Sequence, residues 1–169
     1  MKRLYLLRHA KSSWEDPALA DHDRPLNARG RRAAGRMATY LREQGLRPEL
    51  VLCSSARRTK ETLEQLGEAV TTDSTVEIRP ALYLADADDL LGIVRSIPEP
   101  LESALLIGHN PGMQDLAIEL AGRGDERRRL REKFPTAALA ALEAKIDRWS
   151  ELALGAAELV GYVRPKELR

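Results

Sequence analysis

The stretch RLYLL (3–7) is an uninterrupted apolar run that leads directly into Arg8 and His9. Two later runs, ELVLC (49–53) and SALLI (103–107), have the same length and the same continuous apolar character. Such runs are typical of strands buried on both faces, as in a parallel sheet covered by helices. All three runs end in polar, chemically active residues. These three strands decide the fold and place its polar residues at their ends.

Amphipathic stretches between these runs predict helices. Residues 27–45 place apolar side chains on one stripe with arginines opposite, and a glycine and a proline mark the end. The other predicted helices cover 57–70, 86–97 and 111–122. Two further strands are expected over 137–144 and 157–165, paired antiparallel because their connection is too short for a crossover helix. The fold class is therefore α/β, a three-layer α/β/α sandwich with a mostly parallel central sheet and an antiparallel C-terminal strand pair.

Composition limits the classes of function. The 169 residues carry no internal repeat or linker, which predicts one domain over 1–169. Lysine and arginine number 27 against 26 acids, and aromatic residues make up only 4%, so we expect no nucleic-acid partner. No apolar run approaches the roughly 20 residues of a membrane span, so we expect no membrane association and a cytoplasmic location. A single cysteine, Cys53, excludes an internal disulfide; it is interpreted as a small buried residue.

Each of the three buried strands is followed by groups that suit an anion. Arg8 and His9 follow the first, Arg58 lies in the segment after the second, and His109 follows the third. Ligands of open α/β sheets bind beyond the carboxyl ends of the strands, so these four side chains are expected to meet there. Arginines fit phosphate oxygens, and a neutral imidazole can act as the nucleophile while a backbone carbonyl holds its other N–H. No metal or other cofactor is expected, so arginines and a protonated histidine would supply the positive field.

The motifs resemble those of the histidine phosphatase superfamily, the phosphoglycerate mutase-like branch. LLRHAKSS resembles its RHG signature, CSSARRTKET its second arginine motif and LLIGHNPG its second-histidine motif. Aligned from Thr62, the functional arginine falls on Arg58 and not on Arg57. The short chain, DRPLNARG (23–30) and the segments KFPTAALAAL and YVRPKEL are similar to the compact SixA-like phosphohistidine phosphatases.

The resemblance implies a role for each matching residue. His9 is the expected nucleophile, and Arg8, Arg58 and His109 are expected to clamp the phosphoryl group. Ser12 matches a phosphate-contacting serine of longer relatives. Further contacts with the substrate are expected from residues of the DRPLNARG segment, namely Arg24 and Asn27.

The sequence departs from the family pattern at three motif positions and offers no obvious general acid. Ala10 replaces the glycine of the first signature, and Ser55 and Thr59 replace a proline and an alanine of the second. The candidates for the acid are Asp86, Asp88 and Asp89, and Asp16 or Asp23 could also reach a pocket. SixA-like proteins manage without such an acid. Imidazole leaves phosphorus more readily than an alkoxide does, so a missing acid favours a P–N substrate.

The expected protein is thus a metal-independent phosphatase that removes phosphate from phosphohistidine on a signalling or phosphocarrier protein. No long insertion is left to form a lid, which also favours a protein-borne phosphate. One alternative is a small-molecule phosphomonoesterase with the same site. A second is a non-catalytic phosphoprotein-binding module.

Three other features receive structural interpretations. His22, between Asp21 and Asp23, is assigned to a loop turn and not to a metal site. The arginine-rich segment 123–133 is interpreted as a solvated helix. The alternative is a surface on which an acidic partner docks, and nearby arginines could extend that surface. Those arginines are Arg29, Arg31 and Arg32. Trp14 and Trp149 are expected to pack, with Trp14 near the entrance of the site.

Overall fold

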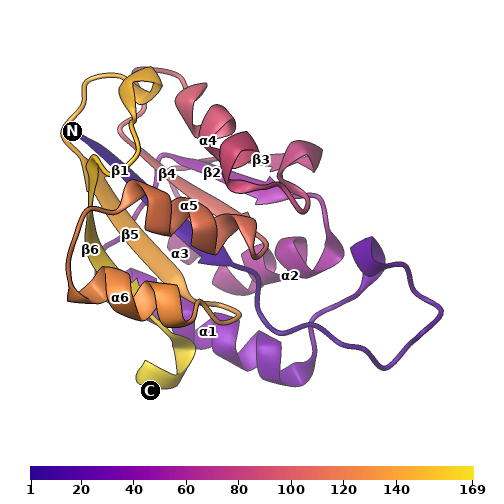
Figure 1. Ribbon diagram of the computed structural model, residues 1–169. Coiled ribbons are helices and arrows are strands. Elements are labelled where there is room, and N and C mark those ends of the chain that lie inside the picture. Colours follow the sequence, from indigo (N-terminus) through magenta and orange to yellow (C-terminus); the bar gives the residue numbers. More distant parts are fainter.

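The computed structural model describes all 169 residues as one mixed sheet with helices on both faces (Figure 1). The sheet has six strands in the order β3-β2-β4-β1-β5-β6. Their bounds are β1 Lys2–Arg8, β2 Leu50–Ser54, β3 Thr75–Arg79, β4 Ser103–Gly108, β5 Leu139–Ala144 and β6 Ala157–Val163. The first four strands pair parallel, whereas β5 is antiparallel to both β1 and β6. The predicted fold class and the antiparallel C-terminal pair are confirmed.

The helices form the two outer layers. They are α1 Ala28–Glu43, α2 Arg57–Leu66, α3 Glu68–Thr71, α4 Ala87–Arg95, α5 Gly112–Leu120 and α6 Asp125–Glu132. Alternate residues of β1 show the division, because Leu4 and Leu6 pack in a core with α4, α5 and α6, whereas Tyr5 and Leu7 pack with α1, α2 and α3. Both faces of the central strands are therefore buried, which explains their continuous apolar sequence. None of the helices is long and apolar enough to span a bilayer.

Two elements differ from the prediction. The strand β3 was not predicted, because it is a short edge strand whose Val76 and Ile78 are exposed and whose sequence alternates with charged residues. The helix predicted over 57–70 is broken at Gly67, whose φ of +52° no helix accommodates. Neither difference affects the strands that carry the polar motifs, because β1, β4 and β2 are direct neighbours as expected.

Two glycines bring helices unusually close to the loops after the strands. A Cβ on Gly30 of α1 would lie 2.1 Å from the carbonyl oxygen of Lys11. A Cβ on Gly112 of α5 would lie 2.0 Å from the carbonyl oxygen of Ala85. Both contacts are with backbone, which cannot move aside, so only glycine allows these approaches. They hold the loop after β1 and the segment before α4 at the same end of the sheet.

Candidate active site

The carboxyl ends of β1, β2 and β4 surround a cavity of about 330 Å³. The predicted Arg8, His9, Arg58 and His109 all line it. The other lining residues are Lys11, Ser12, Trp14, Asp21, Arg24, Leu84, Asn110 and Thr136. The cavity holds two imidazoles, four cationic side chains and a single carboxylate, a composition that suits a phosphate-sized anion.

His9 is oriented by the backbone that follows it. Its Nδ1 lies 2.7 Å from the carbonyl oxygen of Ala10, and because a carbonyl only accepts, Nδ1 carries the proton. Nε2 is left with its lone pair, 3.4 Å from Nε of Arg58, which donates to it. Burial, opposed only in part by that backbone hydrogen bond, lowers the pKa of His9 to about 3. At neutral pH the ring is therefore an uncharged, oriented nucleophile.

His109 lies opposite His9, with 5.3 Å between the ring centroids. Arg58 donates to its Nδ1 over 3.3 Å, so its Nε2 carries the proton and donates to Oγ of Ser54 over 2.8 Å. Burial and the charge of Arg58 lower the pKa of His109 to about 4. His109 is therefore uncharged at neutral pH, and the protonated histidine expected in the positive field stays a prediction. A bound phosphate dianion would raise this pKa again, since an opposite charge favours imidazolium.

Arg58 is the centre of the hydrogen-bond network. Besides the two histidines, it donates through Nη1 to the carbonyl oxygen of Asp21 over 2.7 Å and through Nη2 to Oδ2 of Asp21 over 3.0 Å. Its side chain is 5% exposed, whereas Arg57 points outward and pairs with Glu61. The placement agrees with the assignment of the motif arginine to Arg58 and not to Arg57.

Asp21 is the main feature of the site that sequence reasoning missed. Its carboxylate accepts from Arg58, from Nη1 of Arg24 over 3.0 Å, and from the hydroxyl of Tyr83. The Tyr83 hydrogen bond and the two arginines lower the pKa of Asp21 to about 2. The only sequence signal was the close spacing of Asp21 and Arg24, since Tyr83 lies 62 residues away. Asp21 therefore serves as an ionised counter-charge to the arginines.

Arg8 keeps a free donor for a ligand. Its Nη1 donates to the carbonyl oxygen of Phe134 over 3.1 Å, and Asn110 donates to the same oxygen over 3.0 Å. Its Nε is buried without any partner. Burial and the charge of Arg58 lower the pKa of Arg8, an effect that an anion would reverse. A buried, unsatisfied donor is costly, so a phosphoryl oxygen is its natural partner.

The loop that carries His9 is anchored on both sides. The backbone N–H of Ala10 donates to Oγ1 of Thr62 over 3.0 Å, and Thr62 donates to the carbonyl oxygen of Arg58 over 2.7 Å. On the other side the N–H of Ala137, which has a φ of +62°, donates to the carbonyl oxygens of Arg8 and His9. The threonine of the second motif thus ties the loop to α2. These contacts fix the nucleophile relative to its arginine.

The remaining predicted contact residues divide into two groups. Ser12 and Arg24 line the cavity, Nη2 of Arg24 donates to Oγ of Ser12, and its guanidinium stacks 3.2 Å over the ring of Trp14. Asn27 does not line the cavity; it caps α1 by accepting from the N–H of Gly30 over 2.8 Å. Arg24 and Ser12 are thus positioned to meet a ligand, whereas Asn27 positions the helix.

The five carboxyl groups considered as the acid all lie outside the cavity lining. Asp86 caps α4 by accepting from the N–H of Asp89 over 2.9 Å, and Asp88 and Asp89 are exposed in its first turn. Asp16 accepts from the N–H of Ala18 in its own loop. Asp23 is exposed. Their assignment as acids stays a prediction that this geometry does not favour.

The residues for which a structural and not a functional role was expected are buried or bonded to other parts of the chain. Cys53 is fully buried, and burial raises the pKa of its thiol to about 12. His22 makes a hydrogen bond of 2.9 Å to Oγ of Ser55. The segment 123–133 forms α6, a charged helix that buries Leu130 and whose Arg129 pairs with Glu126 and Glu167. This supports its interpretation as a solvated helix.

Of the two tryptophans that were expected to pack, only Trp149 does so; Trp14 is exposed. Trp149 is 1% exposed within the core, and its indole N–H donates to the carbonyl oxygen of Leu101 over 2.7 Å. Trp14 is 77% exposed and lines the cavity, so it stands at the entrance.

The comparison with known proteins agrees with this geometry. Residues 4–102 match the model of the histidine phosphatase superfamily, branch 1. An uncharacterized protein of Mycobacterium leprae is 36% identical over 166 residues, which cover 95% of this chain and all of that protein.

Two solved structures are similar over nearly their whole length. A SixA from Nakamurella multipartitia, described as a putative phosphohistidine phosphatase, has a TM-score of 0.85 and 31% identity, covering 97% of this chain and 96% of that one. The protein histidine phosphatase SixA complexed with tungstate has a TM-score of 0.79 and 25% identity, covering 98% of each chain. With its motifs, its fold and its paired histidines, this chain belongs to the histidine phosphatase superfamily, branch 1, and is SixA-like in structure.

Proposed function

We propose that this protein hydrolyses phosphohistidine on a protein through a covalent intermediate at His9. Its superfamily supports phosphatase activity, and the substrate is inferred from the site. The observation that supports this choice of substrate is the ionisation state of Asp21, the only carboxyl group that lines the cavity. With a pKa of about 2 and three donors on its oxygens, Asp21 has no proton to give at neutral pH. A site without a carboxylic acid suits a leaving group that needs little protonation.

The first step is an in-line attack by the lone pair of His9 Nε2 on phosphorus. A P–N bond forms to His9 as the P–N bond to the substrate imidazole breaks, and the leaving nitrogen keeps the electron pair and takes a proton from water. The carbonyl oxygen of Ala10 stabilises the positive charge that develops on the His9 ring, because it accepts from Nδ1. Arg8 and Arg58 neutralise the oxygens of the transferring group.

In the second step a water molecule attacks the phosphorus on His9. A P–O bond forms as the P–N bond breaks, and Nε2 recovers its lone pair. One proton of the water stays on the inorganic phosphate, and the other returns to solvent, where it replaces the proton taken up by the leaving imidazole. The phosphoryl group raises the pKa of His109, so this ring is protonated and donates to an oxygen of the phosphoryl group. No step requires a metal ion, since the cationic side chains supply the positive field.

A protein-borne substrate fits the entrance of the cavity. Leu84 and Trp14 line it and are 56% and 77% exposed. No segment closes over these two residues, so a phosphohistidine on a folded partner can reach His9. One SixA relative is complexed with tungstate, a phosphate-like oxyanion, which accords with binding of a phosphoryl group by this fold. A phosphotransfer domain or a phosphocarrier is the expected partner.

The test compares phosphate release from a phosphohistidine protein and from a phosphomonoester such as p-nitrophenyl phosphate, without added metal. Wild type, His9→Ala and Asp89→Asn are assayed on both. The proposal expects release from phosphohistidine that disappears in His9→Ala and is unchanged in Asp89→Asn. Preference for the ester together with loss of activity in Asp89→Asn would overturn the substrate assignment. Absence of any His9-dependent release would favour a binding module.

A further inference from the structure

A second cavity, of about 290 Å³, lies beside the catalytic one and shares Lys11 and Thr136 with it. We call it the basic cavity. Six of its ten lining residues are cationic and none is acidic. The cationic residues are Lys11, Arg29, Arg36, Lys133, Arg164 and Lys166. Nothing in the catalytic steps above uses this cavity.

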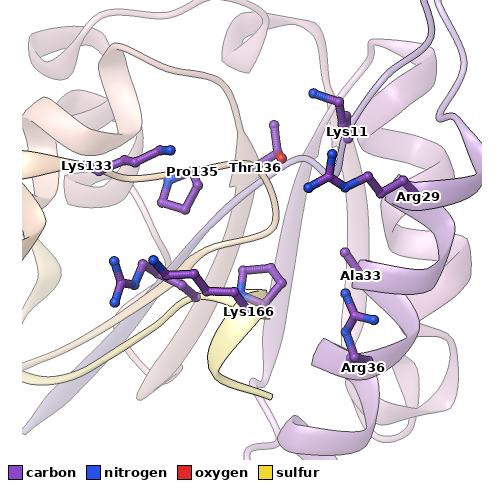
Figure 2. A pocket seen from close by; sticks show the side chains of 10 residues that line it. Lys11, Arg29, Ala33, Arg36, Lys133, Pro135, Thr136 and Lys166 are labelled. Atoms are coloured by element: carbon purple, nitrogen blue, oxygen red, sulfur yellow. The ribbon is translucent and has the colours of Figure 1, made fainter. Parts of the chain in front are cut away.

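The cations of the basic cavity come from four separate segments of the chain (Figure 2). Lys11 follows β1, Arg29 and Arg36 lie two turns apart on α1, and Lys133 follows α6. The turn after β6 adds the last two. Figure 2 shows Lys11 and Arg29 extending into the cavity from one side and Lys133 from the other. Tertiary folding therefore gathers like charges that the balanced overall composition conceals.

Most of these cations lack a counter-charge within the chain. Arg164 pairs with Glu167 over 2.5 Å, but the other five cations of the basic cavity make no ion pair. Nε of Arg36 is buried and has no hydrogen-bond partner. In contrast, Arg57 on α2 is bound by Glu61. Like charges held together without a counter-ion repel one another, and an unpaired buried donor costs free energy, so an anionic ligand would relieve both.

We propose that the basic cavity binds the di- or triphosphate group of a small molecule. Such a group concentrates several negative charges in a small volume, and its oxygens suit the forks of Arg29 and Arg36. The volume of about 290 Å³ is just below the roughly 300–1,000 Å³ typical of small-molecule sites, which fits a compact polyanion. An acidic protein segment offers one charge for each side chain and matches a concave, charge-dense site less well.

The place of Lys11 links this site to the catalytic one. Its backbone is held against Gly30 of α1, and its side chain lines both cavities. The di- or triphosphate therefore lies next to the phosphoryl site without occupying it. Binding needs neither His9 nor Arg58, so the inference stands independently of the proposed phosphatase activity.

The test measures binding of methylenediphosphonate, a diphosphate analogue with an uncleavable P–C–P link, by titration calorimetry at about 0.15 M salt. The double variant Arg36→Ala/Lys133→Ala removes two cations of the basic cavity. The control Arg32→Ala/Arg131→Ala removes the same charge from α1 and α6 at exposed positions outside the cavity. We expect Kd to rise at least about tenfold in the first and to change less than about twofold in the control.

A third variant, Arg58→Ala, separates the two cavities. Binding that survives it with Kd within about threefold supports the basic cavity, because only the catalytic cavity contains Arg58. Loss of binding in Arg58→Ala would place the analogue in the catalytic cavity and overturn the proposal. Equal weakening in the control pair, or no binding to wild type, would overturn it too. Tight binding of a glutamate-rich peptide in place of the diphosphonate would assign the cavity to an acidic protein segment. Circular dichroism checks that each variant is folded.

Discussion

The two neighbouring cavities hold four and six cations, and they differ in how those cations are balanced. In the catalytic cavity Arg58 and Arg24 share the carboxylate of Asp21, and both ring nitrogens of His9 and of His109 have a hydrogen-bond partner. In the basic cavity five of six cations have no ion pair and no carboxylate is present. The first is thus preorganised before any ligand arrives. The second has its charges in place but leaves their neutralisation to a ligand.

The largest expected effect tests the catalytic side of this contrast. Replacing Arg58 by alanine removes donors to both histidines and to Asp21, so kcat/KM should fall about 10²–10³-fold, as for loss of an oxyanion donor. Replacing Arg57, which is exposed and pairs with Glu61, should change it less than about twofold. Steady-state kinetics on a phosphohistidine substrate compare the two. A larger fall in kcat/KM for Arg57→Ala than for Arg58→Ala would mean that Arg57, and not Arg58, binds the phosphoryl group.

A second effect is the pH dependence of stability, which depends on the catalytic cavity because it contains two buried histidines and the basic cavity contains none. The pKa values of His9 and His109 are lowered in the folded state to about 3 and about 4. The unfolded chain therefore binds more protons below its reference pKa near ~6.5, and stability present above that pH is lost as the pH falls. Each histidine should cost about 2 kcal/mol of unfolding free energy at pH 5 relative to pH 7.5.

Urea unfolding of wild type, His9→Gln and His109→Gln at the two pH values measures this effect. Each variant should lose less stability on acidification than wild type, by about 2 kcal/mol. Equal losses in all three proteins would mean that the histidines are not held neutral by burial.

A third effect tests the wall common to both cavities. Because a Cβ on Gly30 would meet the backbone of Lys11 at 2.1 Å, Gly30→Ala should destabilise the fold by about 1–3 kcal/mol and perturb both sites. Gly35 lies on the same helix, and a Cβ added there would meet nothing within 4 Å outside the helix backbone, so Gly35→Ala should stabilise by about 1 kcal/mol. Thermal unfolding gives the signs. A neutral Gly30→Ala would show that α1 is not held against this loop.

The smallest effect concerns the counter-charge itself. Asp21→Asn removes the negative charge that holds Arg58 and repels a phosphate dianion, so product inhibition by phosphate should strengthen while kcat falls, each by about tenfold. Asp23→Asn, exposed and outside the lining, is the control. Measuring kcat and the inhibition constant separately distinguishes this split from simple loss of structure. A fall in both kcat and phosphate affinity would show that Asp21 serves mainly to position Arg58.

Local patterns predicted most of the fold and its four principal cavity residues. The apolar runs identified three strands, and the residues directly after them, together with the motif register, identified Arg8, His9, Arg58 and His109. The pattern failed for β3, where an exposed edge strand has no buried face to mark it, and at Gly67, which interrupts a periodic helix. Assignment of the whole chain to one domain, and of each catalytic role, stays a prediction.

The sequence by itself determined which side chains could perform phosphoryl transfer, because each motif is contiguous with a buried strand and the strand end fixes where its side chains project. Only the tertiary structure decided how those side chains are charged and paired. Asp21 meets Tyr83 across 62 residues, and the basic cavity gathers cations from four segments. Burial and Coulomb interaction depend on distances in space, which contiguous sequence does not encode.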